Sequence, residues 1–350
     1  MSDEGALSRE AIERADPSGM LADVLAQPLQ LGDALWRLES AGLERIDMPA
    51  GLIVCGMGGS AIGGDLAAAA LGDRATRPLR VVRDYALDPW AGDDALVLCA
   101  SYSGNTEETL ACFEAAGAAG APRVALTTGG RLAEDARDEG VPVIGVPGGM
   151  QPRAAVLYMT LGALECAAAC GAGPALHTEA DTAGRLLTEL VGEWGPDAPD
   201  DSEAKAIARS LRGTIPIVTG AGPTVAAAIR WRTQVNENAE AAAFSSVLPE
   251  ADHNELCAWQ RGREAAPLSA VFLEDPDQHP RVRRRIDLTA HAAEQAGAPV
   301  LRVQARGENR LERVLSLVLL GDLVSVYLAV LDGIDPTPVA PIERLKTALV

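Results

Sequence analysis

The feature that most constrains this chain is a short pattern that occurs twice, once in each half. An apolar run, a glycine-rich turn and a helix-like segment follow one another at 53–62 (IVCGMGGSAI) and again at 217–226 (IVTGAGPTVA). Around both copies, apolar runs of strand length alternate with segments of helical periodicity. Such alternation predicts parallel strands whose crossover helices cover both faces of a sheet. We therefore expect an α/β chain with a weak internal duplication.

The same rhythm divides the chain into regions. Residues 1–50 have helical spacing and are expected to form a helical lead-in. A first sheet domain is expected over 51–175, and a second over 201–350. The composition between them turns to Gly, Pro, Asp and Glu, so residues 176–200 are expected to be a linker. Strands are expected at 51–55, 80–82, 95–100, 123–126, 143–146, 214–218, 270–273 and 300–303, and helices at 61–71, 106–116, 151–170, 224–242, 281–296 and 309–331.

Charge and hydropathy narrow the classes of partner. The 350 residues include 49 acidic and 30 basic side chains, a net charge of −19, which opposes binding to nucleic acid or to an acidic membrane surface. The first twenty residues are polar and acidic, and the apolar run 314–331 contains Asp322 and Ser316. We therefore expect a cytoplasmic protein in which that run is a buried helix. A single small phosphate can still be bound by local backbone N–H groups.

The first glycine-rich segment, 56–65 (GMGGSAIGGD), follows an expected strand and opens an expected helix. Glycines there allow the backbone to approach a ligand closely, although a tight structural turn explains them equally well. The run has Ala61 in place of the last glycine of G-x-G-x-x-G, which a dinucleotide-binding turn tolerates. Such a turn also needs an acidic ribose partner at the end of a second strand, for which Asp84 is the candidate. A nucleotide-dependent oxidoreductase therefore has only this run in its favour.

The second loop, 101–108 (SYSGNTEE), also lies between an expected strand and an expected helix. Asn105 is expected to cap that helix, with Glu108 completing a capping box. Capping does not account for Ser101, Ser103 and Thr106, whose three hydroxyls at a helix amino end suit a tetrahedral oxyanion. No Walker-type G-K-[ST] sequence is present, which argues against a P-loop nucleotidase.

Four polar residues could perform acid–base chemistry, and each also has a plainer interpretation. Glu237 lies between two asparagines in VNENA, which is either a solvated helix end or a site, because asparagine favours helix interiors poorly. His253, in DHNE, is either an exposed loop residue or a proton carrier. Arg153, next to Pro152 at a helix start, is either a merely exposed residue or a functional cation, because a positive charge does not favour the amino end of a helix. Lys346 is near the carboxyl end, where lysines are ordinarily exposed.

Together, SYSGNT and GMGGSAIGGD resemble the sugar isomerase (SIS) domain, and the chain from 51 to 346 resembles the bifunctional phosphoglucose/phosphomannose isomerases. The resemblance implies two SIS-type domains, each a parallel sheet flanked by helices in a flavodoxin-like three-layer sandwich. It also implies that the phosphate of a sugar phosphate contacts the two loops through Gly59, Ser60, Ser101, Ser103 and Thr106.

The resemblance also assigns chemistry. Glu237 would be the base that moves a proton between C1 and C2, and Arg153 would stabilise the enediolate. His253 would assist ring opening from the neighbouring subunit, which implies a homodimer, and Lys346 in IERLK would join the site. Glu240 stands where relatives commonly have lysine, and Thr337 is near the position associated with mannose selectivity.

We therefore expect an aldose–ketose isomerase that interconverts glucose 6-phosphate with fructose 6-phosphate through a cis-enediolate, with mannose 6-phosphate as a second candidate substrate. No cofactor is expected, because proton transfer needs none, and no metal, because the four histidines are scattered. The alternatives are a non-catalytic phosphosugar sensor, which would lack the acid–base residues, or an isomerase of the same fold acting on another phosphosugar.

Overall fold

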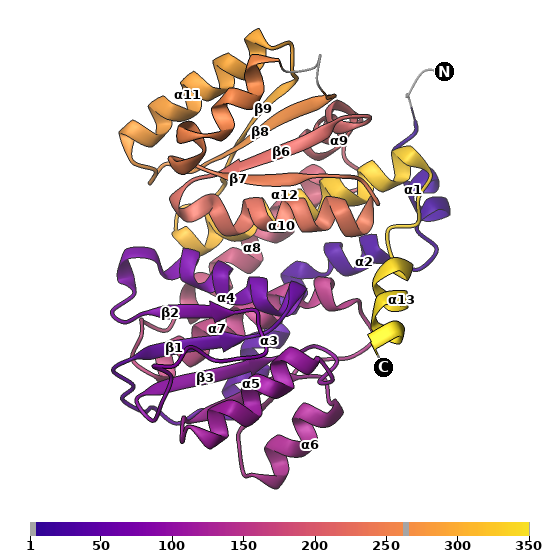
Figure 1. Ribbon diagram of the computed structural model, residues 1–350. Coiled ribbons are helices and arrows are strands. Elements are labelled where there is room, and N and C mark those ends of the chain that lie inside the picture. The colour runs from indigo at the N-terminus through magenta and orange to yellow at the C-terminus, as the bar shows by residue number, and fades with distance from the viewer. Residues whose placement is uncertain (1–4, 262–265, 350) are drawn as a thin grey trace. The chain divides into compact units, whose positions relative to one another are not determined.

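The computed structural model describes residues 5–261 and 266–349. The chain divides into two compact units, each assembled from separate stretches of sequence. The five-stranded unit comprises Ala26–Arg185 and Asn309–Glu312. The four-stranded unit comprises Met1–Leu25, Leu186–Glu308 and Arg313–Val350. Both contain a parallel sheet with helices on its two faces, which confirms the predicted α/β class (Figure 1).

The five-stranded unit has strands in the order β2-β1-β3-β4-β5, all parallel. Helices α4 and α7 lie on one face of this sheet, and α5 and α6 lie on the other (Figure 1). Its strands are β1 (Gly51–Cys55), β2 (Leu79–Val82), β3 (Ala95–Ala100), β4 (Arg123–Thr127) and β5 (Val143–Gly145). Its helices are α3 (Gln27–Ala41), α4 (Gly58–Leu71), η1 (Gly72–Arg74), α5 (Glu107–Ala118), α6 (Gly130–Asp138), η2 (Pro152–Ala155) and α7 (Val156–Ala169), after which α8 (His177–Trp194) begins.

Strand alternation and small residues build the core of this unit. Ile53 and Cys55, two residues apart on β1, join Phe113 of α5 in one apolar cluster. On the opposite face α4 approaches α7 closely, since a Cβ on Gly63 would lie 2.5 Å from the Met159 Cβ. Although the chain has few aromatic residues, the core of this unit is well packed, because glycine and alanine allow the helices to approach closely.

The four-stranded unit has the order β7-β6-β8-β9, again all parallel. This order corresponds to β2-β1-β3-β4 of the other sheet, as the internal repeat predicts. Helix α11 lies on one face, and α10 and α12 on the other (Figure 1). The strands are β6 (Ile215–Gly220), β7 (Phe244–Val247), β8 (Leu268–Glu274) and β9 (Val300–Gln304). The helices are α1 (Arg9–Ala15), α2 (Met20–Leu25), α9 (Glu203–Leu211), η3 (Gly222–Thr224), α10 (Val225–Asn238), η4 (Glu250–His253), η5 (Glu255–Gln260), α11 (Pro280–Gln295), α12 (Arg310–Asp332) and α13 (Ala340–Leu349).

The end of α10 differs from the sequence expectation. The helix ends at Asn238 instead of continuing to residue 242, and Glu240 adopts a left-handed φ of 49°. This turn leads into β7, an edge strand that the sequence pattern does not predict, because FSSV contains no apolar run. The structure also contains α8 over most of the range 176–200 that was expected to be a linker.

Helix α12 is the one helix among the described residues that is long and apolar enough to cross a membrane. Its apolar window is 100% buried inside the protein. A core helix that is apolar all round meets the same criteria of length and composition, as was expected for this run.

Candidate active site

Two loops leave neighbouring strands at the same edge of the five-stranded sheet. Strands β1 and β3 are adjacent and parallel, with Cys55 paired to Cys99, so their carboxyl ends lie together. The first loop runs into Ser60 and α4, and the second begins at Ser101. A hydrogen bond of 3.2 Å from the Tyr102 N–H to the Ser60 Oγ joins the loops. The two loops predicted to bind phosphate are thus hydrogen-bonded to each other at this edge.

The hydroxyls of the second loop hold its shape. The Ser101 Oγ lies 2.8 Å from the Thr106 Oγ1 and accepts a hydrogen bond from the Gly104 N–H at 3.1 Å. The Ser103 Oγ accepts from the Asn105 N–H at 3.2 Å. Ser101 is 1% exposed, whereas Ser103 is exposed, so the loop offers both a buried and an accessible hydroxyl.

The expected capping role of Asn105 is wrong. The residue that precedes α5 is Thr106, and no side chain caps the helix. The Asn105 Oδ1 instead accepts from the Arg131 N–H at 3.1 Å, and its Nδ2 donates to the Ser103 carbonyl at 3.2 Å. Asn105 is therefore engaged with its own loop and with the start of α6, which leaves the first backbone N–H groups of α5 without a capping side chain.

Arg153 comes to this edge through a close backbone approach. It lies in η2 and is 3% exposed. A Cβ on Gly59 would lie 2.9 Å from the Arg153 Cα and 3.0 Å from the Pro152 carbonyl oxygen. Only glycine allows α4 to pass η2 at this distance, so Gly59 determines the position of the Arg153 backbone.

The residues of this edge have the chemistry of an oxyanion cradle. They combine hydroxyl groups, the amino ends of α4 and α5 and one guanidinium within a single unit. Helix amino ends and hydroxyls donate hydrogen bonds to phosphate oxygens, and a guanidinium adds positive charge. Of the nine residues predicted for the site, the structure brings together Gly59, Ser60, Ser101, Ser103, Thr106 and Arg153.

Glu237 lies in the four-stranded unit, in the last turn of α10, and is partly buried. The flanking asparagines have structural roles. The Asn236 Nδ2 donates to the Ala241 carbonyl at 2.8 Å, and the buried Asn238 donates to the Ser325 Oγ of α12 at 2.9 Å. The two asparagines thus secure the turn on one side of the glutamate and the helix packing on the other.

His253 is the last residue of η4 and is exposed. The residue before it is well anchored. The Asp252 carboxylate accepts from the Arg285 Nη1 at 2.7 Å and from the Thr289 Oγ1 at 2.9 Å, both on α11. His253 therefore lies on a segment that is fixed to α11, and its side chain is accessible.

Lys346 lies in α13, a helix without buried residues, and is exposed. Thr337 precedes this helix, with its Oγ1 3.5 Å from the Asp16 Oδ1 and its N–H bonded to the Asp335 Oδ1 at 3.1 Å. Glu237, His253 and Lys346 thus belong to three separate elements of the four-stranded unit. Among the described residues there is no group of three or more His, Cys, Asp or Glu placed to hold a metal ion.

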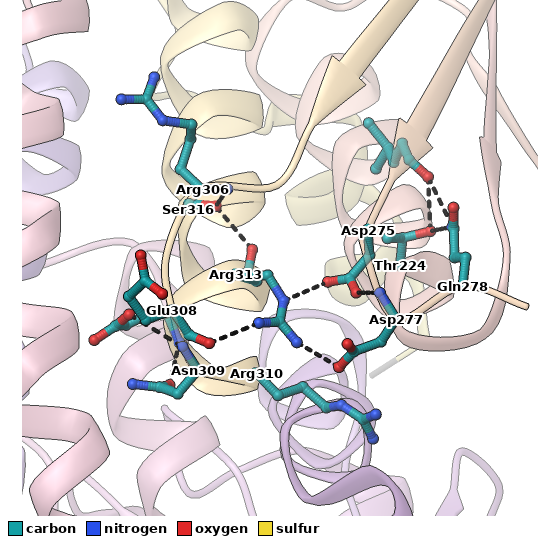
Figure 2. Close-up of polar contacts among 12 residues, drawn as sticks. Thr224, Asp275, Asp277, Gln278, Arg306, Glu308, Asn309, Arg310, Arg313 and Ser316 are labelled. Atoms are coloured by element: carbon teal, nitrogen blue, oxygen red, sulfur yellow. Dashed lines mark hydrogen bonds and ion pairs between the residues drawn. The ribbon is translucent and has the colours of Figure 1, made fainter. Parts of the chain in front are cut away.

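At the corresponding edge of the four-stranded sheet, side chains of the protein are joined to one another by hydrogen bonds and ion pairs (Figure 2). The buried Arg313 donates to the Asp275 Oδ2 at 2.9 Å and to Asp277 at 2.5 Å. The Gln278 Nε2 donates to the Ala221 carbonyl at 3.0 Å, and the Thr224 Oγ1 donates to the Leu273 carbonyl. Acidic side chains and an internal ion pair here replace the hydroxyl loop of the other sheet.

Comparison with known proteins matches both halves of the chain. Residues 200–349 match the profile of the bacterial phospho-glucose isomerase C-terminal SIS domain. A bifunctional phosphoglucose/phosphomannose isomerase of Caldicellulosiruptor bescii is 37% identical over 301 residues, covering 85% of this chain and 89% of that protein. One of Aquifex aeolicus is 37% identical over 300 residues, covering 85% and 90%. Among solved structures, a hypothetical protein of Thermus thermophilus has a TM-score of 0.71 at 18% identity, covering 99% of this chain and 95% of that one.

Proposed function

The chain belongs to the family of bifunctional phosphoglucose/phosphomannose isomerases, and on that premise we propose how its residues act. It is an isomerase, and the reaction consistent with its relatives interconverts glucose 6-phosphate or mannose 6-phosphate with fructose 6-phosphate. The observation that carries the proposal is the cradle of Ser60, Ser101, Ser103 and Thr106 at the ends of β1 and β3, with Arg153 beside it. We assign the sugar phosphate group to this cradle.

The proposed chemistry moves a carbon-bound proton from C2 to C1 and a hydroxyl proton from O2 to O1. The Glu237 carboxylate removes the proton from C2 of the aldose phosphate and returns it to C1, with an enediolate between the two steps. The Arg153 guanidinium stabilises the negative oxygen that develops, because a fixed cation in a buried place needs no reorganisation. Lys346 is assigned a contact with the substrate.

The test is a coupled assay of purified protein with fructose 6-phosphate that follows glucose 6-phosphate and mannose 6-phosphate separately. Glu237→Gln should lower kcat by about 10²–10⁴-fold, the usual contribution of a general base. Glu189→Gln makes the same change at an exposed glutamate of α8 and should leave kcat unchanged. Binding of fructose 6-phosphate by wild type without either product would favour a sensor or another phosphosugar.

We propose that the protein is a cytoplasmic homodimer in which His253 acts on the substrate of the neighbouring subunit. Its exposed ring on a braced segment supports this assignment, because the ring is accessible to a second chain. The six free cysteines, five of them buried, are typical of a reducing compartment.

Mixed dimers test the role of His253 directly. Glu237→Gln and His253→Ala are each expected to be nearly inactive alone. If His253 acts across the interface, each mixed dimer has one intact site, and coexpression should restore roughly a quarter of wild-type activity for random pairing of a twofold dimer. Failure of the coexpressed pair to regain activity would place His253 in its own chain's site.

Selectivity at C2 is assigned to Thr337, supported by its hydroxyl and its place before α13. Thr337→Val keeps the shape and removes the hydroxyl. We expect the ratio of mannose 6-phosphate to glucose 6-phosphate formed to fall in this variant. The rate at which fructose 6-phosphate is converted to glucose 6-phosphate should be retained. An unchanged ratio would exclude the assignment.

A further inference from the structure

We propose that Tyr102 is a positioning residue whose hydroxyl holds the turn formed by residues 147–150 and thereby places Arg153 beside the phosphate-binding loops. This inference rests on the proposed function, because it assigns a supporting role within that site. Tyr102 lies between Ser101 and Ser103, and nothing in the loop's oxyanion chemistry requires an aromatic residue there.

The backbone of Tyr102 is fixed by hydrogen bonds on both sides. Its N–H donates to the Ser60 Oγ at 3.2 Å, which ties it to the amino end of α4. Its carbonyl accepts from the Thr128 N–H at 3.0 Å and from the Thr128 Oγ1 at 2.8 Å, just beyond β4. The side chain therefore extends from a point that both loops define.

The hydroxyl of Tyr102 then bridges the two ends of the turn. It donates to the Pro147 carbonyl at 3.2 Å and accepts from the Met150 N–H at 3.1 Å. Between these residues stand Gly148 and Gly149, the latter at a φ of 97°. Two adjacent glycines give the backbone wide conformational freedom, so the two hydrogen bonds select one conformation of the turn.

Arg153 follows Met150 by three residues. The Ala154 N–H donates to the Gln151 carbonyl at 2.9 Å and starts η2 directly after the turn. On its other side η2 meets Gly59 at the close approach described above. The Arg153 backbone is thus held between Gly59 and the turn that Tyr102 secures. Stabilisation of developing charge depends on the position of the donor, so a looser turn weakens this stabilisation without removing any phosphate contact.

Tyr102→Phe tests the inference, because it keeps the ring and removes both hydrogen bonds. We expect kcat to fall by about tenfold, the effect of one or two hydrogen bonds, with KM for fructose 6-phosphate nearly unchanged. The matched control is Tyr158→Phe in α7, which removes a hydrogen bond of 2.8 Å to the Asp33 Oδ2. This control should leave kcat unchanged.

Two further measurements separate positioning from loss of folded protein. With glucose 6-phosphate deuterated at C2, the isotope effect on kcat should rise in Tyr102→Phe, because proton transfer then limits the rate more fully. A smaller fraction of folded enzyme would leave that effect at its wild-type value. Amide hydrogen exchange across residues 147–153 should quicken in Tyr102→Phe and not in Tyr158→Phe.

The outcomes distinguish this inference from the proposed function. Unchanged exchange across 147–153, or unchanged kcat and isotope effect in an active enzyme, would overturn the role of Tyr102. If wild type isomerises no sugar phosphate, the proposed function fails, and faster exchange in Tyr102→Phe would still establish that the hydroxyl holds the turn.

Discussion

Glu240 adopts a backbone conformation that its side chain disfavours. It directly follows the capping residue of α10 with a φ of 49°, a position where helices commonly have glycine. An L-residue with a Cβ is strained in this region, whereas glycine is not. The strain lies three residues after Glu237, and the helix must end here for β7 to join the sheet.

Glu240→Gly should therefore stabilise the protein, by about 0.5–1 kcal/mol after the entropy cost of glycine is included. Urea unfolding measures this difference. Glu240→Ala is the matched control, because it removes the charge and keeps the Cβ. Equal gains in both variants would show that charge, and not backbone conformation, is responsible.

Gly59 is a residue whose role depends on its lack of a side chain. Gly59→Ala places a Cβ against the backbone of η2 and should displace Arg153, lowering kcat on the order of 10²-fold. Gly32→Ala in α3 is the control, since no atom lies within 4 Å of its added Cβ. Wild-type kcat in Gly59→Ala would mean that η2 can shift without affecting the chemistry.

At the scale of elements, α10 is clamped to α12 along much of its length. The Arg230 guanidinium makes two hydrogen bonds to the Asp322 carboxylate, at 2.9 and 2.7 Å, and both side chains are almost fully buried. The Trp231 Nε1 donates to the Leu317 carbonyl at 2.7 Å. Asn238, next to Glu237, makes a further contact between α10 and α12. The orientation of the proposed base therefore depends on the packing of these two helices.

Two aspartates of α12 allow a controlled test of this clamp. Asp322→Ala leaves a buried guanidinium without its carboxylate and should cost about 3–5 kcal/mol of unfolding free energy. Asp332→Ala removes an ion pair with Arg212 whose side chains are 34% and 40% exposed, so it should cost about 0–1 kcal/mol. Similar unfolding free energies for the two variants would contradict a structural role for the buried pair.

At the scale of the whole molecule, the reactivity of the cysteine thiols measures how well the core is packed. Cys257 in η5 is exposed, and the other five cysteines are buried. Burial raises the pKa of the Cys166 thiol, and the neighbouring Cys55 thiol together with burial raises the pKa of Cys112. At most one thiol per chain should therefore react rapidly with a disulfide reagent in the native protein, and all six in denaturant. Rapid reaction of a second thiol in native protein would contradict the packing of the core.

Much of the fold is predictable from sequence because buried parallel strands are continuous apolar runs. Strand β3 begins and ends where its apolar run does. Strand β7 is not predictable in this way, because an edge strand with exposed Phe244 has no such run. Helix α8 is not predicted because its sequence is rich in polar residues, although it has the amphipathic spacing of a helix.

The site follows the same division. The resemblance to the SIS domain implies that Ser101, Ser103 and Thr106 act together with Ser60, and the parallel pairing of β1 with β3 brings the two loops to one edge. The approach of Gly59 to Arg153 and the reach of the Tyr102 hydroxyl to residue 147 are tertiary contacts without a local signal. The same holds for Asn105, whose side chain bonds Arg131 instead of capping its own helix.

The ion pair of Arg313 with Asp275 and Asp277 has a consequence for binding stoichiometry. The two halves repeat one another in strand order, yet this internal pair occupies the second edge and its carboxylates repel anions. Calorimetric titration with a phosphosugar should therefore saturate at one equivalent per chain, despite the duplicated architecture. The two repeats thus differ in their proposed roles: the five-stranded unit has the proposed anion cradle, and the four-stranded unit has an internal ion pair at this edge and carries Glu237, the proposed base.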